Sequence, residues 1–272
     1  MRQFFSVLVF WIGVSSVGYA EQSTDLRKMM TGDDSRGWEA VGRLNIAGKG
    51  MCTGALIAPD LVLTAAHCVF DKVNKQQFGA SKIEFLAGWR GGRASAYADV
   101  KRVVVHPEYV YAASSTDIRV ANDVALLQLT RPINKTSITP FQTDVRPRKG
   151  ADVGIVSYAH DRAESPSIQD SCQVLARQSS TLIMSCDVDY GSSGAPVFST
   201  GEGAPRIVSV ISAMAEVNGR KVALGMALEK PLALLMAKLK ETSSPFQRAK
   251  PVALRLGQKG GVSRMGAKFL RP

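Results

Sequence analysis

One serine in this chain has the neighbours that a nucleophile needs. Ser193 lies in the run Gly191–Pro196, GSSGAP. A serine becomes nucleophilic when a base takes its proton and hydrogen-bond donors stabilise the oxyanion that it creates. Small neighbours let the backbone turn tightly, so the amides of Gly191 and Ser193 can point at one substrate oxygen, while Gly194 and Ala195 leave room for a substrate chain. Such runs are ordinarily turns, so the motif alone does not establish the chemistry.

Two further motifs supply the groups that would activate this serine. His67 follows the apolar run Leu61–Leu63 within the sequence TAAHC, and Asp123 stands at the head of the apolar run Val124–Leu127. A histidine can accept the serine proton, and a buried carboxylate can hold the histidine in the required tautomer. The three motifs together predict nucleophilic catalysis, although each residue alone is more often a core or turn residue.

The order His67, Asp123, Ser193 resembles that of the chymotrypsin/trypsin superfamily of serine proteases, in particular its bacterial secreted branch, which includes the glutamyl endopeptidases. The resemblance runs from about Trp38 to about Leu228. It implies a serine endopeptidase that hydrolyses peptide bonds through an acyl-enzyme intermediate. In this reaction His67 is the base, Asp123 orients it, and the amides of Gly191 and Ser193 form the oxyanion hole.

The elements that must position these residues are short strands. Many short apolar or alternating runs separated by Gly, Pro and Asp predict an all-β fold, as a sandwich or as barrels. The resemblance implies two six-stranded Greek-key β-barrels, at 37–140 and 141–228, with the active site between them. A short amphipathic helix is expected at 229–241. Examples of such short apolar or alternating runs are Ala55–Ile57, Leu61–Leu63, Ile83–Leu86, Val103–Val105, Val124–Leu129, Val153–Tyr158, Leu182–Met184, Ile207–Ile211 and Val222–Met226.

The chain has four cysteines, which allow three disulfide pairings. The family resemblance favours the sequential pairing, Cys52 with Cys68 and Cys172 with Cys186. The cysteine spacing does not suit a metal, because no CxxC pair occurs and the whole chain has only three histidines. We therefore expect neither a metal nor a cofactor.

The residues that would bind the substrate side chain are less clearly marked. Asp187 lies six residues before Ser193, where trypsin-type enzymes keep the acid that binds Lys or Arg, but an acid on the surface beside Cys186 is an equally good interpretation. Glutamyl endopeptidases keep a histidine where this chain has Ile211. The other candidate substrate-binding residues are Tyr190, Ser212 and Met214.

The N-terminal residues have the composition of an export signal. An apolar stretch with small residues at its end predicts a signal peptide at 1–20, and an uncleaved membrane anchor is the alternative. Residues 21–36 are polar and suggest a short propeptide or a disordered N-terminus. In trypsin-like zymogens a new N-terminus pairs with an aspartate just before the nucleophile, but Ser192 stands there. We expect an exported protein, secreted or periplasmic, that is not activated by this insertion.

A basic tail follows the expected helix. Residues 242–272 carry seven of the +11 formal charges and no acidic residue, with glycines and prolines that indicate disorder. The tail is either a solvated extension or a tether to an anionic membrane or polysaccharide surface, and nucleic acid is not an expected partner. The alternative function is therefore a non-catalytic binding protein on a protease scaffold that acts through this tail. The expected partner of the enzyme is a protein or peptide substrate, and a monomer is expected.

Overall fold

The computed structural model describes residues 24–113, 116–199, 201 and 203–241. The expected signal peptide at 1–20 and the basic tail at 242–272 lie outside these residues. Within the described part of the chain, no helix has the length and apolar character that crossing a membrane would require.

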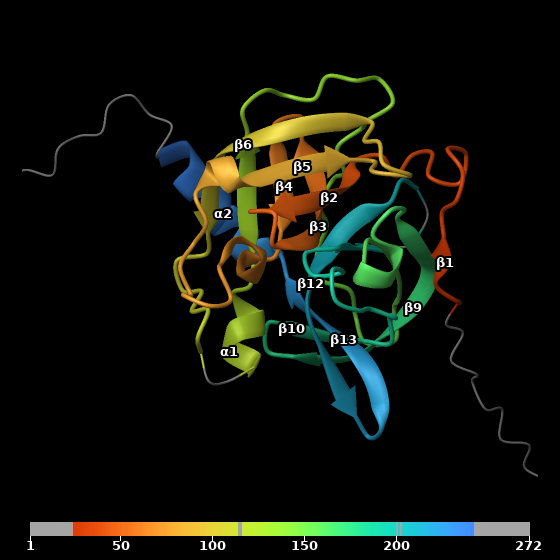
Figure 1. The fold of residues 1–272 in the computed structure, drawn as a ribbon. Coiled ribbons are helices and arrows are strands. Elements are labelled where there is room, and N and C mark those ends of the chain that lie inside the picture. Colours follow the sequence, from red (N-terminus) through yellow and green to blue (C-terminus); the bar gives the residue numbers. More distant parts are fainter. Residues whose placement is uncertain (1–23, 114–115, 200, 202, 242–272) are drawn as a thin grey trace, which may run out of the picture.

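Six antiparallel strands of the N-terminal half close into a barrel, drawn in orange to yellow-green in Figure 1. Buried and partly exposed side chains alternate along β2, where Leu44 and Ile46 are buried and Arg43 and Asn45 are not, which is typical of a sheet with one face in the core. Around the ring the strands are β2 (Val41–Ile46), β3 (Gly50–Ala58), β4 (Leu61–Thr64), β7 (Ala125–Leu129), β6 (Ala96–Val105) and β5 (Ile83–Ala87).

The second barrel repeats the topology of the first. Counted within its own barrel, each set of strands follows the order 1-2-3-6-5-4 around the ring, and the pairing of β8 with β9 closes the second ring. The two six-stranded Greek-key barrels expected from the family resemblance are thereby confirmed. The strands, in ring order, are β8 (Asp152–Ser157), β9 (Ser167–Gln178), β10 (Thr181–Met184), β13 (Arg220–Ala227), β12 (Arg206–Val217) and β11 (Pro196–Ser199).

Three aromatic rings join the barrels. Trp38 precedes the first barrel, Phe141 lies on the connection between the barrels, and Phe198 belongs to β11. Their ring centroids lie 4.7 to 5.8 Å apart. The backbone N–H of Phe141 also donates to the carbonyl of Leu56 in β3, at 2.9 Å. The packing of these rings fixes one barrel against the other.

The expected C-terminal helix, α2 (Glu229–Glu241), is present. Its buried side chains Leu232, Leu235 and Leu239 are spaced for one helical face. Although α2 follows the second barrel in sequence, it lies against β6 of the first (Figure 1), where Arg102 Nη2 donates to the carbonyl of Leu239 at 2.8 Å.

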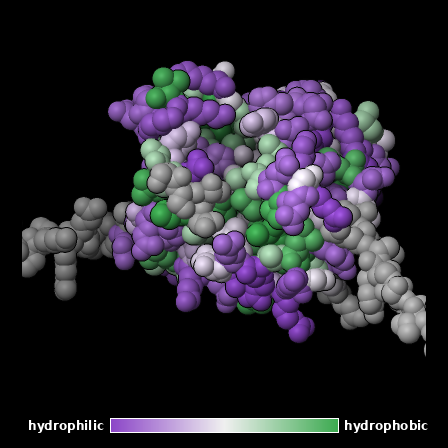
Figure 2. Space-filling model, turned by 90° about the horizontal axis from the view of Figure 1, so that it is seen from below, coloured by the Kyte–Doolittle hydropathy of each residue, from purple (hydrophilic) through white to green (hydrophobic). Residues whose placement is uncertain are grey.

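A shorter helix, α1 (Thr116–Ala121), leads directly to Asp123. It lies against β10 and β13, and its Val120 packs with Val222 and Leu224 in a small apolar cluster. Figure 2 views the molecule from this side and shows a mostly polar surface with apolar surface gathered near its middle. The contact fixes the end of α1, so the residue that follows it has a defined position.

The N-terminal segment differs from what the sequence suggested. The described residues from Thr24 onward are ordered, because β1 (Arg27–Lys28) pairs with β9 through Arg27 opposite Ile168. The N–H of Met29 donates to the carbonyl of Pro166 at 2.9 Å, and the Met29 side chain is fully buried. The expectation of a disordered segment at 21–36 is therefore wrong for its described part, which a buried methionine and strand pairing hold on the second barrel.

Two disulfides close short loops around the expected site. Cys52 of β3 is bonded to Cys68, and Cys172 of β9 is bonded to Cys186, as the family resemblance favoured. Each bridge spans 16 or 14 residues, a loop length for which a disulfide contributes about 3 kcal/mol to the free energy of unfolding.

Candidate active site

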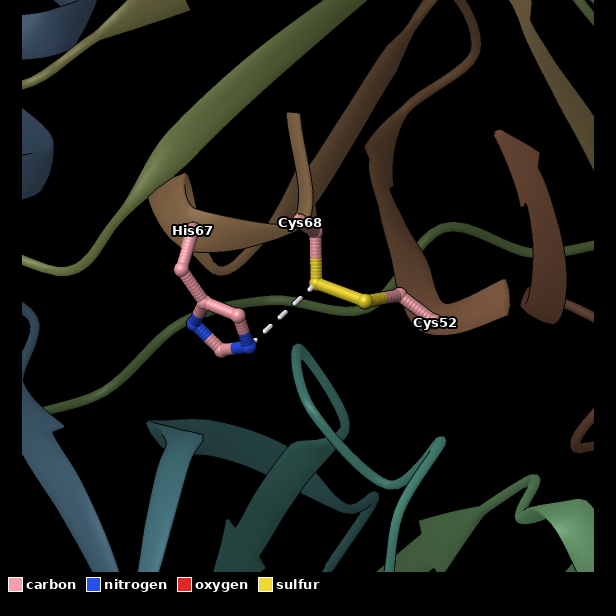
Figure 3. Close-up of side chains that lie close together, drawn as sticks. All are labelled: Cys52, His67 and Cys68. Atoms are coloured by element: carbon pink, nitrogen blue, oxygen red, sulfur yellow. Dashed lines mark hydrogen bonds between the residues drawn. A yellow bond between two sulfur atoms is a disulfide. The ribbon is translucent and has the colours of Figure 1, made fainter. Parts of the chain in front are cut away.

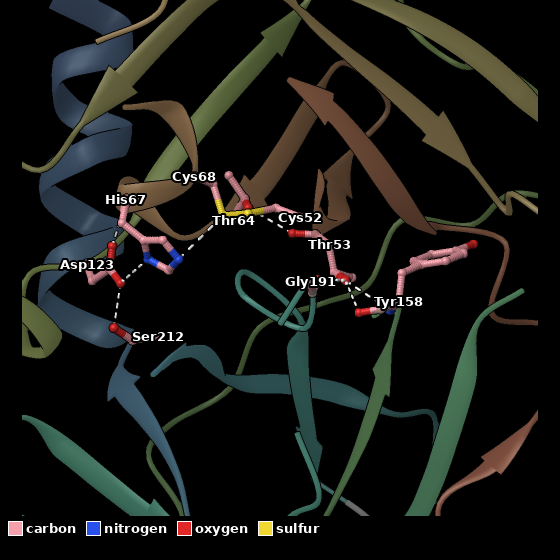
Figure 4. Close-up of a disulfide and its surroundings, with 9 residues drawn as sticks. All are labelled: Cys52, Thr53, Thr64, His67, Cys68, Asp123, Tyr158, Gly191 and Ser212. Carbon is pink, nitrogen blue, oxygen red and sulfur yellow. Dashed lines mark hydrogen bonds and ion pairs between the residues drawn. A yellow bond between two sulfur atoms is a disulfide. The ribbon is translucent and has the colours of Figure 1, made fainter. Parts of the chain in front are cut away.

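His67 and Asp123 form a hydrogen-bonded pair on the first barrel. A single 3₁₀ turn after β4, η1 (Ala66–Val69), carries His67, and the loop between α1 and β7 carries Asp123. Oδ2 of Asp123 lies 2.7 Å from Nδ1 of His67, and Oδ1 accepts the backbone N–H of His67 at 2.8 Å (Figure 4). Because a carboxylate accepts at Nδ1, that nitrogen carries the proton and Nε2 is left as a proton acceptor.

The second barrel contributes to the same pair. The hydroxyl of Ser212 in β12 also donates to Oδ2 of Asp123. The Asp123 side chain is only 4% exposed, whereas that of His67 is 25% exposed. A carboxylate that accepts three hydrogen bonds inside the protein is held in place against the imidazole. The hydrogen bond between Ser212 and Asp123 therefore depends on the correct docking of the two barrels.

The ionised Asp123 controls the protonation of His67. Burial of the ring lowers the pKa of His67, but the charge and the hydrogen bond of Asp123 together raise it by more. The pKa of His67 therefore lies above the ordinary value for histidine, about 6.5. His106 has the opposite balance, because burial lowers its pKa and the nearby Glu108 raises it by less.

When the pH is lowered, His67 is expected to take up its proton before His106. The histidine ring signals in an NMR titration, assigned with the variants His67→Gln and His106→Gln, measure this order. Because the folded-state pKa of His67 is raised, its protonation stabilises the fold below about pH 6.5, and this contribution is lost as the pH rises through the folded-state pKa. Protonation of His106 at the higher pH would contradict the contact between His67 and Asp123.

Ser193 lies on the loop between β10 and β11, beside two backbone amides without partners. Among the described residues, neither the N–H of Gly191 nor that of Ser193 donates a hydrogen bond. Gly191 has a φ of +101°, a conformation that glycine adopts without strain. Two free amides, that of the candidate nucleophile itself and that of the residue two positions before it, are the donors that an oxyanion hole requires.

Thr53 of β3 holds this loop from the first barrel. Its N–H donates to the carbonyl of Ser193 at 2.9 Å. Its hydroxyl donates to the carbonyl of Gly191 at 3.0 Å (Figure 4). The same hydroxyl accepts the N–H of Tyr158 at 3.0 Å. Both carbonyls are thus fixed while both amides stay free. Sequence reasoning missed Thr53, because its partners lie more than 100 positions away in the chain.

Position 194 requires a glycine for a reason other than the one that the sequence suggested. A Cβ at this position would overlap Thr64 Oγ1 and the carbonyl oxygen of Thr53, and φ is +80°. Glycine is needed here because the loop packs directly on β3 and β4. Ala195 is fully buried, so the interpretation that Gly194 and Ala195 leave room for a substrate chain is wrong.

The disulfide of the first barrel lies directly beside His67 (Figure 3). Cys68, the neighbour of His67, is bonded to Cys52, the neighbour of Thr53, which holds Ser193. Among the described residues no hydrogen bond joins Ser193 to His67, and the nearest partner of His67 Nε2 is Cys68 Sγ at 3.9 Å. Catalytic hydrogen bonds are often long in unliganded proteins and tighten when substrate binds.

Cys52, His67 and Cys68 also present the one group of possible metal ligands among the described residues. The two sulfur atoms are bonded to each other, so neither is a thiolate that could bind a metal.

The candidate substrate-binding residues separate into two cavities. Ser212 lines a cavity of about 400 Å³ together with His67 and Asp123. Asp187 and Met214 line a smaller cavity of about 220 Å³, in which Lys221 is also present. Tyr190 lines neither, and its side chain is exposed to solvent. Asp187 is also exposed, which favours the interpretation as a surface acid over that of a buried specificity residue.

Comparison with known proteins agrees with this geometry. A family model described as Trypsin matches residues 30–227, so the chain belongs to the trypsin family of serine proteases. Human "Serine protease 23" is 30% identical over 167 residues, which cover 54% of this chain and 42% of that protein. The "Glutamyl endopeptidase" of Bacillus licheniformis is 25% identical over 171 residues, or 62% of this chain and 52% of the relative. The chain thus spans about half the length or less of these curated relatives.

The resemblance to glutamyl endopeptidases is also present in the three-dimensional fold. A solved structure described as "Structure of Glu endopeptidase in complex with MPD" matches with a TM-score of 0.65 at 18% identity, covering 79% of this chain and 96% of the other. At this identity the likeness shows the fold. The resemblance to glutamyl endopeptidases that the motifs indicated is confirmed.

Proposed function

We propose that this protein is a serine endopeptidase that hydrolyses peptide bonds through Ser193, His67 and Asp123. The observation that carries the proposal is the hydrogen-bonded Asp123–His67 pair, together with a loop that offers a serine and two free amides. The trypsin family makes peptide-bond hydrolysis the natural reaction for this set of groups.

Ser193, His67 and Asp123 each have a separate role in the reaction. Ser193 Oγ attacks the carbonyl carbon of the scissile bond while Nε2 of His67 takes its proton. The C–N bond then breaks, and His67 returns the proton to the departing amine. A water molecule repeats both transfers and releases the acyl group from Ser193. Asp123 stays ionised throughout and stabilises the imidazolium that forms between transfers.

The amides of Gly191 and Ser193 would receive the negative charge on the carbonyl oxygen. Thr53 holds the carbonyls of both residues, so little reorganisation is needed when the charge develops. Loss of one such donor typically lowers kcat by about 10²- to 10³-fold.

Export and a protein substrate follow from the same proposal. Two disulfides are typical of proteins that leave the reducing cytosol. The enzyme would then act on proteins or peptides in a secreted or periplasmic location.

The two cavities lined by candidate substrate-binding residues differ in character, since one is lined by the Asp123–His67 pair and the other by Asp187 and Lys221.

Labelling with a fluorophosphonate probe tests the proposal, because this reagent modifies a serine only where a base and oxyanion donors activate it. The full chain is expected to be labelled, and Ser193→Ala is expected to abolish the labelling. Ser180→Ala, in the exposed turn between β9 and β10, is the matched control and should be labelled as the wild type is. A folded wild-type protein that resists the probe would exclude the protease function and favour a binding protein.

A further inference from the structure

A buried arginine lies next to the loop that carries the candidate nucleophile. Arg162 ends the 3₁₀ turn η3 (His160–Arg162), and its side chain is only 9% exposed. Its Nη2 donates to the hydroxyls of Ser157 and Ser192, both at 3.3 Å. Its Nε is buried without a hydrogen-bond partner. The guanidinium is thus held inside the second barrel chiefly by two serine hydroxyls.

The charge of Arg162 is poorly compensated. Asp161 lies 3.1 Å from Nη1, but its side chain is 69% exposed, and among the described residues it is the one carboxylate paired with this arginine. A buried guanidinium is costly unless its donors find acceptors. Stability alone does not explain an arginine in such a position without a buried ion pair. The contact of Arg162 with Ser192 supplies another reason for its position.

Ser192 is the residue between the two candidate oxyanion donors. Its side chain is fully buried, and its Oγ accepts from Arg162 Nη2 and from the N–H of Asp189, both at 3.3 Å. The hydroxyl proton is then available for Ser157 Oγ at 3.4 Å. A serine hydroxyl has two acceptor sites and one proton, so all of its capacity is used. Any rotation of the peptide units on either side of Ser192 would break these bonds.

The loop is therefore held from two sides. Thr53 fixes the carbonyls of Gly191 and Ser193 from the first barrel, and Arg162 fixes the side chain between them from the second. With these groups fixed, the N–H groups of Gly191 and Ser193 are the ones left free. The two N–H groups of Nη2 serve the two serines, while Nη1 reaches Asp161, so the planar guanidinium contacts all three side chains at once.

We propose that Arg162 is the positioning residue of the oxyanion hole, which it keeps assembled through Ser192 before substrate arrives. The inference rests on the proposed protease function and goes beyond it, since Arg162 touches neither the substrate nor the reacting atoms. Arg162, which supports the oxyanion hole in this proposal, is itself a residue of the second barrel.

The rate of fluorophosphonate labelling measures this role, because the phosphonyl oxygen of the probe occupies the oxyanion hole and the substrate need not be known. Arg162→Met is expected to lower the labelling rate constant about 10²-fold. Ser192→Ala, which removes the hydroxyl that Arg162 contacts, is expected to lower it by a similar factor. If Arg162 acts through Ser192, the double variant should label no more slowly than Arg162→Met alone. Arg148→Met removes an exposed arginine from the connection between the barrels and should label at the wild-type rate.

Two further readouts separate positioning from a general loss of structure. The midpoint of the acid limb of the labelling rate, which reports His67, should stay unchanged in Arg162→Met while the plateau falls. With a peptide substrate, kcat should fall with KM nearly unchanged, and a peptide aldehyde of the same sequence should bind more weakly by the same factor as kcat falls. Arg162→Lys is expected to recover only part of the rate.

The outcomes distinguish this inference from the proposed function. Labelling of Arg162→Met at the wild-type rate would overturn the role of Arg162 and leave the protease function intact. Effects of Arg162→Met and Ser192→Ala that multiply would also overturn it, because the two residues would then act independently. Should Arg162→Met fail to fold, Ser192→Ala decides, and a wild-type rate in that variant overturns the inference. A wild type that is not labelled at all would overturn the protease function and this inference with it.

Discussion

Replacing Ser193 by alanine is expected to lower kcat for peptide hydrolysis by about 10⁶-fold, and adding His67→Ala to the same chain is expected to lower it no further. The physical reason is that the two groups act on one proton. Without the hydroxyl there is nothing for Nε2 of His67 to deprotonate, and without Nε2 the hydroxyl stays a poor nucleophile. The residual activity of all three variants should come from the oxyanion donors and substrate binding alone.

The measurement is kcat on one peptide for the two single variants and the double variant. Ser180→Ala, which removes a hydroxyl from an exposed turn, serves as the control and should keep the wild-type value. Effects of Ser193→Ala and His67→Ala that multiply would mean that the residues do not form one catalytic unit. Because no hydrogen bond joins them in the unliganded protein, this double variant is the direct test of their coupling.

Asp123→Asn is expected to lower kcat by roughly 10⁴-fold while leaving the fold in place. An amide at this position would donate to Nδ1 of His67 and move the ring proton to Nε2. The imidazole could then no longer accept the proton of Ser193. The loss of the carboxylate charge also removes what raises the pKa of His67, and the burial that lowers it remains. The acid limb of the pH profile, above pH 6.5 in the wild type, should therefore move below 6.5.

Asp33→Asn provides the matched control, because it removes the same charge from an exposed loop in which the Asp33 side chain is paired with Arg36. Its kcat and its acid limb should equal those of the wild type. An Asp123→Asn variant with full kcat, or with an acid limb at higher pH than the wild type, would contradict the role proposed for Asp123.

The sequence predicted the strands that contain continuous apolar runs, such as those of β4, β7 and β8. It did not mark β9, whose sequence SIQDSCQVLARQ has one short apolar run in twelve residues, because β9 buries polar residues such as Gln169 and Ser167 among its apolar ones. It also missed β11, which begins with a proline. Burial of polar residues depends on partners elsewhere in the fold, and local patterning does not encode those partners.

The same limit applies to the candidate site. His67, Asp123 and Ser193 were found because each stands in a short motif whose chain order is informative. Thr53 and Arg162 were not found, because each acts through contacts with a loop that lies far from it in the sequence. Neither the residue type nor the neighbours in sequence distinguish Arg162 from an ordinary surface arginine. Such residues become visible only when burial and hydrogen bonds are known.

The strand pairing of β1 has a consequence for the order in which the chain can reach its native state. Arg27 is made early, yet its partner Ile168 follows about 140 residues later. At a synthesis rate of about 5–20 residues per second, the N-terminal segment must wait roughly 7 to 28 s for that partner. The first barrel can close in the meantime, since its own strands lie between the two. The earliest described residues to be made are therefore among the last to find their place, and they are added to the second barrel rather than beginning the first.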